Sequence, residues 1–416
     1  MTVSRRVFLQ GAAGLATALA APPLAAPALA QGPVIRIGVL ADFSGIYTDL
    51  LGRGGVGCAR QAATEFLAGA SGPAKGLEVE VLFGDHQNKA DTGASLVRRW
   101  IDQQGVDMVI AGPNSAVGLA VSTIAREKDK ACLGVAVTAT EFTNKLCTPN
   151  TVNWTYDGYM LSKAVAAETV RGGGKKWYFI ATDNAFGHSL QAETTTFVQQ
   201  AGGEVVGSAR APLGTGDFSA MLIAARGSGA DVIGLALGGN DLPNCIKQAH
   251  EFGVTRSMKM AALVMFLNDI RAAGLDTMQK LLFTNSFYWD TNDRTRAFTR
   301  RVLPAMGGAY PGMVHAGCYA VTLHYLKAVA ALGVEAAKAS GAATVARMKA
   351  MPTEDDAFGA GSIRADGRAV LPAYLLQVKT PAESTGGWDY CKLVSTMAPE
   401  ETVKPLAQSE CPLIRS

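Results

Sequence analysis

Three hydroxyl side chains have the chemistry to hold a carboxylate. Ser115 follows a short apolar segment and opens an expected helix, and Thr138 and Thr140 lie in the loop after the next apolar segment. In open α/β sheets, ligands bind at the carboxyl ends of strands, where helix N-termini offer unpaired N–H groups. Helix capping is the alternative role for each hydroxyl taken singly. The three together predict a cradle for an anionic group.

No catalytic motif accompanies this cradle. The glycines of Gly52–Gly57 match G-x-G-x-x-G, but a long loop separates them from the strand that ends near Asp42, whereas a dinucleotide fingerprint needs a direct strand-to-helix turn. The chain has no P-loop and no G-x-S-x-G elbow, and its five histidines fit no metal-binding spacing. We therefore expect a binding protein without a cofactor or a metal, and not an enzyme.

The elements that position the cradle alternate between short apolar strands and amphipathic helices. Strands are expected at 35–40, 77–83, 107–111, 177–181, 204–207, 231–237, 260–266, 281–287 and 374–379, and helices at 54–70, 91–104, 116–128, 189–201, 217–226, 242–252, 294–302 and 316–332. This alternation predicts βαβ units and parallel sheets. Because the strands are too many for one open sheet, we expect an α/β fold of two doubly wound lobes. A single closed barrel is the alternative.

Two aromatic segments interrupt this alternation. They are Trp154–Tyr159 and Phe287–Asp290, and they fall where a chain that crosses between two lobes would lie. Aromatic walls are typical of ligand clefts, so these segments are candidates to line one, and ordinary packing at a lobe edge is the alternative. The chain from Met351 onward is expected to wrap across both lobes.

Composition excludes several classes of protein. Of the 416 residues, 48% are apolar and 18% are charged, which suits packed cores and not a disordered chain. The formal net charge is +3, and the 38 basic residues form no cluster. We therefore expect no nucleic-acid partner.

The first thirty residues have the pattern of an export signal. Arg5 and Arg6 precede an apolar run with an A-x-A ending at 28–30, which is typical of a secretory signal peptide, and residues 4–9 fit the twin-arginine motif. An ordinary Sec signal is the alternative. Cleavage after Ala30 would leave the mature chain in the periplasm, where disulfides can form.

The chain has seven cysteines, and none forms a C-x-x-C motif. Cys132 with Cys147, or Cys391 with Cys411, are plausible local disulfides. The odd number leaves at least one thiol free, and the connectivity stays open.

Seven segments, in order along nearly all of the mature chain, resemble the periplasmic solute-binding proteins of ABC transporters, of the branched-chain amino-acid (Leu/Ile/Val) type. These segments are IRIGVLADFSGIY, GPNSAV, VTATEFTN, DNAFGHSL, ALGGNDLPNCIKQAHEFG, FYWDTNDRTRAF and VHAGCYAVTLHYLKAV. The resemblance implies a type I periplasmic binding fold, in which two lobes joined by hinge crossovers close on a small-molecule solute. It also implies delivery of that solute to ABC permease membrane subunits.

We divide the chain on this basis into a signal peptide at 1–30 and two lobes. Lobe 1 is expected to hold 31–153 and 287–350, and lobe 2 is expected to hold 154–286 and 351–416. We expect the protein to be a monomer.

The resemblance also assigns site residues by position. Ser115 and the Thr138–Thr140 segment resemble the carboxylate-binding loops of the family's first lobe. Phe186 takes the place of an aromatic wall in the second lobe, and Asn240 lies in the loop that completes that lobe's side of the site. Tyr47, in the loop after the first strand, is expected to clasp the ligand together with Phe186.

One departure from the family pattern concerns the group that would hold an ammonium. Amino-acid binders of the family use an acidic side chain in the second lobe, but the matching strand end here reads Leu263-Val264-Met265-Phe266. Asp157, Asp183 or Asp241 are possible substitutes, and none matches well. An unpaired buried ammonium is costly.

The ligand is therefore expected to be either a branched-chain or hydrophobic amino acid, or an aromatic or aliphatic carboxylate. A ligand-sensing regulatory receptor on the same fold is the alternative function, and an exported enzyme is a less favoured one.

Overall fold

The structure is a computed structural model that describes residues 33–415. The predicted signal peptide, its twin-arginine motif and its cleavage site lie outside these residues. None of the helices within 33–415 is long and apolar enough to cross a membrane.

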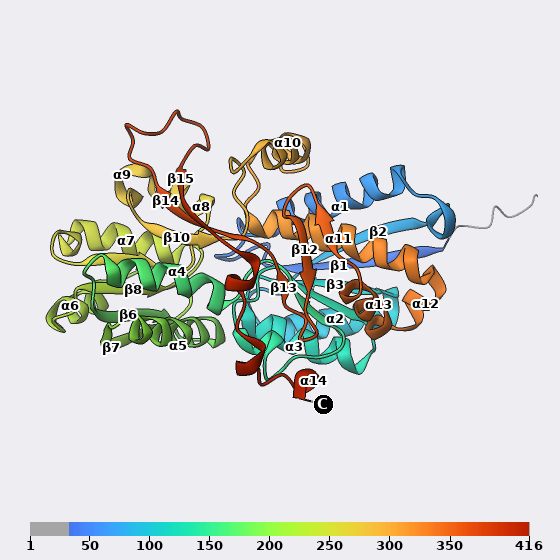
Figure 1. The fold of residues 1–416 in the computed structure, drawn as a ribbon, viewed down its shortest axis with the longest axis horizontal. Coiled ribbons are helices and arrows are strands. Elements are labelled where there is room, and N and C mark those ends of the chain that lie inside the picture. The colour runs from blue at the N-terminus through green and yellow to red at the C-terminus, as the bar shows by residue number, and fades with distance from the viewer. Residues whose placement is uncertain (1–32, 416) are drawn as a thin grey trace, which may run out of the picture. The chain divides into compact units, whose positions relative to one another are not determined.

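The first large sheet has five parallel strands in the order β2-β1-β3-β4-β5. They are β1 (Val34–Ala41), β2 (Glu78–Asp85), β3 (Met108–Ala111), β4 (Ala131–Gly134) and β5 (Thr151–Asn153). Helices α1 (Gly52–Ala68) and α11 (Met313–Leu332) cover one face, and α2 (Ala90–Gln104) and α3 (Ser115–Glu127) cover the other (Figure 1). Side chains alternate along each strand, so Ile37 and Val39 join the core under α1 while Leu40 joins the core under α2. We call this sheet and its helices lobe 1.

The second large sheet has four parallel strands in the order β7-β6-β8-β9. They are β6 (Lys176–Thr182), β7 (Glu204–Ala211), β8 (Val232–Ala236) and β9 (Lys259–Ala262). Trp177 and Phe179 pack with α4 (Gly158–Arg171) and α5 (Ala185–Gln200), whereas Tyr178 and Ile180 pack with α6 (Ser219–Gly227) and α7 (Asp241–Glu251). We call this group lobe 2. The predicted α/β class with parallel sheets is confirmed.

Two small antiparallel sheets complete the described chain, and only two of their strands match predicted ones, at 281–287 and 374–379. One pairs β10 (Leu282–Asn285), β14 (Ala373–Val378) and β15 (Cys391–Met397), and the other pairs β11 (Thr353–Asp355), β12 (Gly359–Ile363) and β13 (Ala369–Val370). The further helices are α8 (Leu267–Ala273), α9 (Leu275–Met278), α10 (Asp293–Val302), α12 (Val334–Ala339), α13 (Gly341–Lys349) and α14 (Pro412–Arg415). Short strands with mixed polarity, such as β12, carry no periodic signal, which is why the sequence pattern missed them.

The chain passes between the two large sheets at the two predicted aromatic segments. The first passage lies between β5 and α4 and contains Trp154, and the second lies between β10 and α10 and contains Phe287. The chain passes between the lobes a third time after β13. Arg368, next to β13, forms a β-bridge with Asn153 at the edge of lobe 1, whereas the following strand, β14, pairs with β10. We therefore propose a lobe boundary near residue 371 in place of the expected boundary at residue 351.

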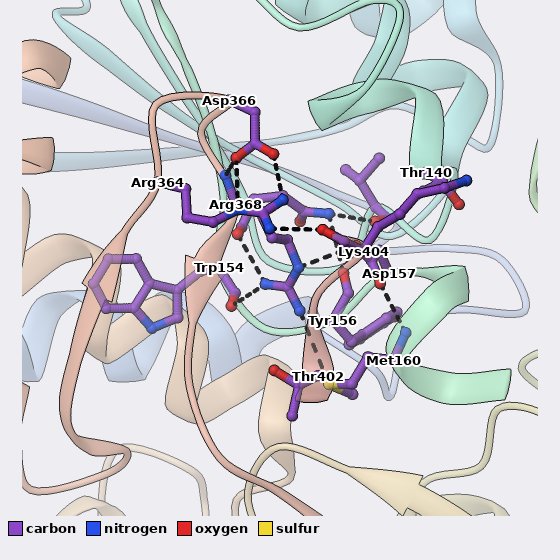
Figure 2. A network of polar contacts seen from close by, with 12 residues as sticks. Thr140, Trp154, Tyr156, Asp157, Met160, Arg364, Asp366, Arg368, Thr402 and Lys404 are labelled. Carbon is purple, nitrogen blue, oxygen red and sulfur yellow. Dashed lines mark hydrogen bonds and ion pairs between the residues drawn. The ribbon is translucent and has the colours of Figure 1, made fainter. Parts of the chain in front are cut away.

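A buried guanidinium fixes the first passage. The Arg368 side chain is only 2% exposed, and its Nε lies 3.1 Å from Asp157 Oδ2. Its Nη1 donates to the carbonyl oxygens of Asn153, at 3.1 Å, and Trp154, at 2.9 Å (Figure 2). Asp157 also caps α4 by accepting the Met160 N–H. Arg368 thus ties β13 to the passage and to the first turn of the helix that follows it.

The one disulfide of the described residues joins Cys147 to Cys411, across 264 positions of the sequence. Both pairings considered from the sequence are therefore wrong, because Cys132 and Cys391 are buried free thiols. The bond attaches the C-terminal segment to lobe 1. The same segment reaches lobe 2 through the ion pair of Lys404 with Glu193, so it contacts both lobes.

Candidate functional site

The strand orders of the two large sheets locate a site. In lobe 1 the chain order reverses between β1 and β3, and in lobe 2 it reverses between β6 and β8. Ligands of open α/β sheets bind outside the carboxyl ends of the strands at such reversal points. Tyr47 and Gly238 lie in the loops that follow β1 and β8, and Ser115 and Phe186 lie in the first turns of α3 and α5, which follow β3 and β6.

These segments meet around a small cavity, which we call the ligand cavity. Its lining is mostly apolar and aromatic and comes from both lobes; it consists of Tyr47, Leu50, Pro113, Asn114, Ser115, Ala136, Thr138, Tyr156, Phe186, Gly238, Val264 and Phe266. Four of the six predicted site residues line the cavity, namely Tyr47, Ser115, Thr138 and Phe186.

A buried carboxylate shapes the loop that presents Tyr47. Asp42, at the end of β1, accepts the backbone N–H groups of Ser44, Gly45 and Tyr47 at 3.2, 2.6 and 3.0 Å. It also accepts the Asn88 side-chain amide at 2.5 Å. These four bonds satisfy the carboxylate and fix the turn, so the Tyr47 ring is held against the cavity.

The polar end of the cavity lies at the N-terminus of α3. The Asn114 side chain caps this helix by accepting the N–H groups of Ala116 and Val117, which leaves the Ser115 hydroxyl free of that task. Ser115 Oγ instead accepts the N–H groups of Thr138, at 3.2 Å, and Ala139, at 3.1 Å. A hydroxyl has two acceptor sites and one donor. The Ser115 O–H therefore remains available to donate to a ligand oxygen.

Two predicted site residues lie elsewhere. Thr140 does not line the cavity; its N–H donates to Ser189 Oγ of α5 at 3.1 Å, which is a contact between the lobes. Asn240 is exposed at the start of α7, and its neighbour Gly238 takes the place in the cavity wall. In both cases a neighbouring residue, Thr138 or Gly238, lines the cavity instead.

Aromatic rings form most of the remaining wall. Tyr47 faces Phe186 across Gly238. A Cβ atom added at Gly238 would lie 3.4 Å from Tyr47 Cε1 and 3.5 Å from Phe186 Cζ. Tyr156 and Phe266 pack with ring centroids 6.2 Å apart. Sequence reasoning did not assign Tyr156 and Phe266 as site residues, although Tyr156 lies in the first aromatic segment. Burial raises the pKa of the Tyr47 and Tyr156 phenols, so both stay protonated and present O–H donors.

No lining residue of the cavity carries a charge at neutral pH. The three acids considered as ammonium partners are engaged elsewhere: Asp157 pairs with Arg368, Asp183 pairs with His188, and Asp241 accepts the Gly214 N–H. Within residues 33–415, no group of three His, Cys, Asp or Glu side chains could hold a metal ion. The cavity thus offers hydroxyl donors and aromatic faces, but no counter-ion for a cation.

One buried acid behind the cavity gives a pH dependence that can be measured. Asp269 of α8 accepts the Phe266 N–H at 2.8 Å, and burial raises its pKa to about 7. The native state then holds a proton that the unfolded state, with a pKa near 3.9, has lost. Because the native state binds the extra proton, stability should fall as pH rises from about 4 to 7.

We therefore expect Asp269→Asn to have a higher free energy of unfolding than wild type. The difference should grow by about 1 kcal/mol for each pH unit between pH 5 and pH 7. The asparagine oxygen can still accept the Phe266 N–H. Urea unfolding at several pH values measures the difference, and Asp276→Asn, at an exposed position of α9, is the control. A stability difference that does not change with pH would contradict the assignment.

Comparisons with known proteins identify the family of this chain. Residues 34–386 match the family model described as periplasmic binding protein. A crystal structure of a periplasmic binding protein from Burkholderia mallei is 39% identical, with a TM-score of 0.86 over 91% of this chain and 99% of that chain. The periplasmic ligand-binding protein of a branched-chain amino-acid ABC transporter from Burkholderia xenovorans LB400 is 33% identical, with a TM-score of 0.79 over 91% of this chain and 100% of that chain.

More distant relatives share the fold. Leu/Ile/Val-binding protein homolog 6 of Brucella suis is 24% identical over 316 residues, which are 71% of this chain and 78% of that protein. An ABC transporter solute-binding protein from R. palustris, solved in complex with benzoate, is 18% identical, with a TM-score of 0.76 over 88% of this chain and 97% of that chain. The chain therefore belongs to the family of periplasmic binding proteins, which are exported to the periplasm, bind solutes for ABC transporters and are not enzymes.

Proposed function

We propose that this chain binds an aromatic carboxylate, or a branched aliphatic carboxylate of similar size, that carries no α-ammonium group. The observation that carries the proposal is the uncharged lining of the ligand cavity, which has hydroxyl donors at one end and aromatic rings around the rest. A carboxylate can be held by N–H and O–H donors near a helix N-terminus. An ammonium would be desolvated there without a partner.

The relatives are compatible with either ligand class. The Burkholderia xenovorans protein is described as part of a branched-chain amino-acid transporter, whereas the R. palustris protein was solved with benzoate. The fold therefore accommodates aromatic acids, and the choice for this chain rests on its own cavity. The missing acidic partner favours the carboxylate without an amino group.

Closure of the lobes supplies the mechanism. The cavity wall draws on loops of both lobes, so a solute completes its contacts only when the lobes are together. Contacts made only in the closed form shift the equilibrium towards closure. The closed form presents both lobes to the permease in one relative orientation.

A thermal-shift screen of the mature chain tests the proposal. The panel contains benzoate, 4-hydroxybenzoate, 4-methylpentanoate, L-leucine and L-phenylalanine. A ligand at 100 times its Kd adds about 2.7 kcal/mol to the free energy of unfolding, which raises the melting midpoint. We expect stabilisation by the acids without an amino group. Stabilisation by the amino acids alone would reject the proposal.

A glycine at the contact between the lobes gives a second test. Gly239 has φ +59°, and a Cβ at this position would lie 2.5 Å from the carbonyl oxygen of Ile46 in the other lobe. Gly239→Ala should therefore oppose closure and raise the Kd for benzoate by at least about 10-fold, which isothermal titration calorimetry would measure. Gly229→Ala is the matched control, since Gly229 has φ +74° and nothing within 4 Å of the added carbon. Equal affinities of the two variants would contradict the closure mechanism.

A further inference from the structure

A second hollow lies near the ligand cavity and is much larger, at about 610 Å³. We call it the outer groove. Its walls come from the β1–α1 loop and the start of α1 in lobe 1, from α8 in lobe 2, and from the chain around Tyr310 and Trp388. Solvent-exposed residues such as Arg53 and Arg271 line it, so it lies at the surface.

The ionisable side chains of the outer groove are Arg53, Arg271, Asp49 and His315. Neither arginine forms an ion pair with any residue in the described part of the chain, and Asp49 forms none there either. Arg271 lies over the ring of Trp388, at 4.7 Å from its centroid, and Trp388 stacks on Tyr310 at 5.8 Å. Two guanidinium groups against one carboxylate leave the groove positive.

His315 adds a neutral donor to the same wall. Its Nδ1 accepts the Gly312 N–H at 3.3 Å, so the ring proton must lie on Nε2. Burial lowers the pKa of His315 to about 4, and the ring is therefore uncharged at neutral pH. The arginines, and not the histidine, provide the positive field.

A third, small hollow lies between the outer groove and the ligand cavity. It shares Leu50 and Phe266 with the ligand cavity, and it shares Asp49, Asn268 and His315 with the outer groove. The three hollows therefore follow one another from the surface to the binding site.

The constriction between them is formed by both lobes. The Asn268 side-chain amide of α8 donates to the backbone carbonyl oxygen of Asp49 in the β1–α1 loop. Leu50 and Phe266 lie directly behind this bond and are almost fully buried. Separation of the lobes would break this hydrogen bond and, at the same time, move Leu50 away from Phe266.

We propose that the outer groove is the entrance for an anionic solute, and that the Asn268–Asp49 contact closes behind the solute once it has passed. The inference rests on the proposed function, because the entrance serves the same ligand cavity. Arg53 and Arg271 raise the local concentration of an anion at the mouth, which increases the association rate. Neither arginine lines the ligand cavity, so we expect both to leave the dissociation rate unchanged.

Stopped-flow binding of benzoate tests the entrance. The Arg53→Gln/Arg271→Gln double variant should bind about 5-fold more slowly than wild type at low ionic strength, and the difference should vanish in 0.5 M salt. Arg99→Gln/Arg226→Gln is the control, because it removes the same charge from exposed positions of α2 and α6. Asn268→Ala should instead raise the dissociation rate. An association rate that matches the control variant would overturn the proposal.

A second measurement decides the inference without any ligand. Iodide, an anion, should quench Trp388 fluorescence more strongly than caesium does, and the difference should fall at least 2-fold in the Arg53→Gln/Arg271→Gln variant. A Trp388→Phe variant identifies the signal of this residue. Equal quenching in the double variant and its control would reject a positive entrance. If wild type binds none of the three carboxylates of the thermal-shift panel that lack an amino group, the proposed function fails, and the quenching result still decides the charge of the groove.

Discussion

Replacing Arg368 by alanine is expected to lower the free energy of unfolding by about 3–5 kcal/mol. The substitution leaves the Asp157 carboxylate buried without its partner, and it removes the donor to the carbonyl oxygens of Asn153 and Trp154. A buried charge that loses its counter-ion carries the full cost of desolvation. Since these groups lie in the passage between the lobes, the loss should also loosen the hinge.

Urea unfolding at pH 7 measures this effect. Arg98→Ala is the control, because Arg98 pairs with Glu127 on the surface, where both side chains are about half exposed. Exposed pairs contribute about 1 kcal/mol or less. A loss of less than about 1 kcal/mol for Arg368→Ala would show that the network of Figure 2 does not stabilise the hinge.

Replacing Phe186 by alanine is expected to weaken the binding of benzoate by about 100-fold, which corresponds to about 2.7 kcal/mol. Phe186 lines the ligand cavity from lobe 2 and faces Tyr47 of lobe 1, so we expect it to contact a solute only in the closed form. Its loss should therefore remove affinity that drives closure. The free energy of unfolding without ligand should change less than the binding free energy, because the ring faces a cavity.

Isothermal titration calorimetry and urea unfolding, done on the same preparation, separate the two effects. Phe252→Ala is the control, since Phe252 is 47% exposed and lies outside the cavity. A large loss of stability with unchanged affinity would place Phe186 in the core and not in the binding site.

The fold could be predicted from the sequence because its signal is local. Strands such as β6 and β8 are short apolar runs between amphipathic helices, and this alternation dictates parallel sheets. The same logic located the loops at the strand ends and selected Ser115 and Thr138, whereas the roles of Tyr47 and Phe186 were implied by the resemblance to the family. Their role in ligand binding stays a prediction.

The rest of the site depends on how loops turn and on distant segments that come together. Thr140 and Asn240 lie in the right loops, but a 3₁₀ turn and a helix start direct them away from the cavity. Phe266 lines the cavity from the segment that follows β9 in lobe 2. At this segment the family pattern led us to consider only an acidic side chain that could hold an ammonium. The Cys147–Cys411 bond joins the C-terminal segment to lobe 1, and no local spacing could reveal it.

The central claim is that the ligand cavity accepts a carboxylate and excludes an ammonium. Calorimetric titration with matched pairs tests it most directly, because 3-phenylpropanoate differs from L-phenylalanine, and 4-methylpentanoate from L-leucine, only by the amino group. We predict that the acid of at least one pair binds at least about 100-fold more tightly than its amino acid. Binding of either amino acid as tightly as its deaminated partner would contradict the claim.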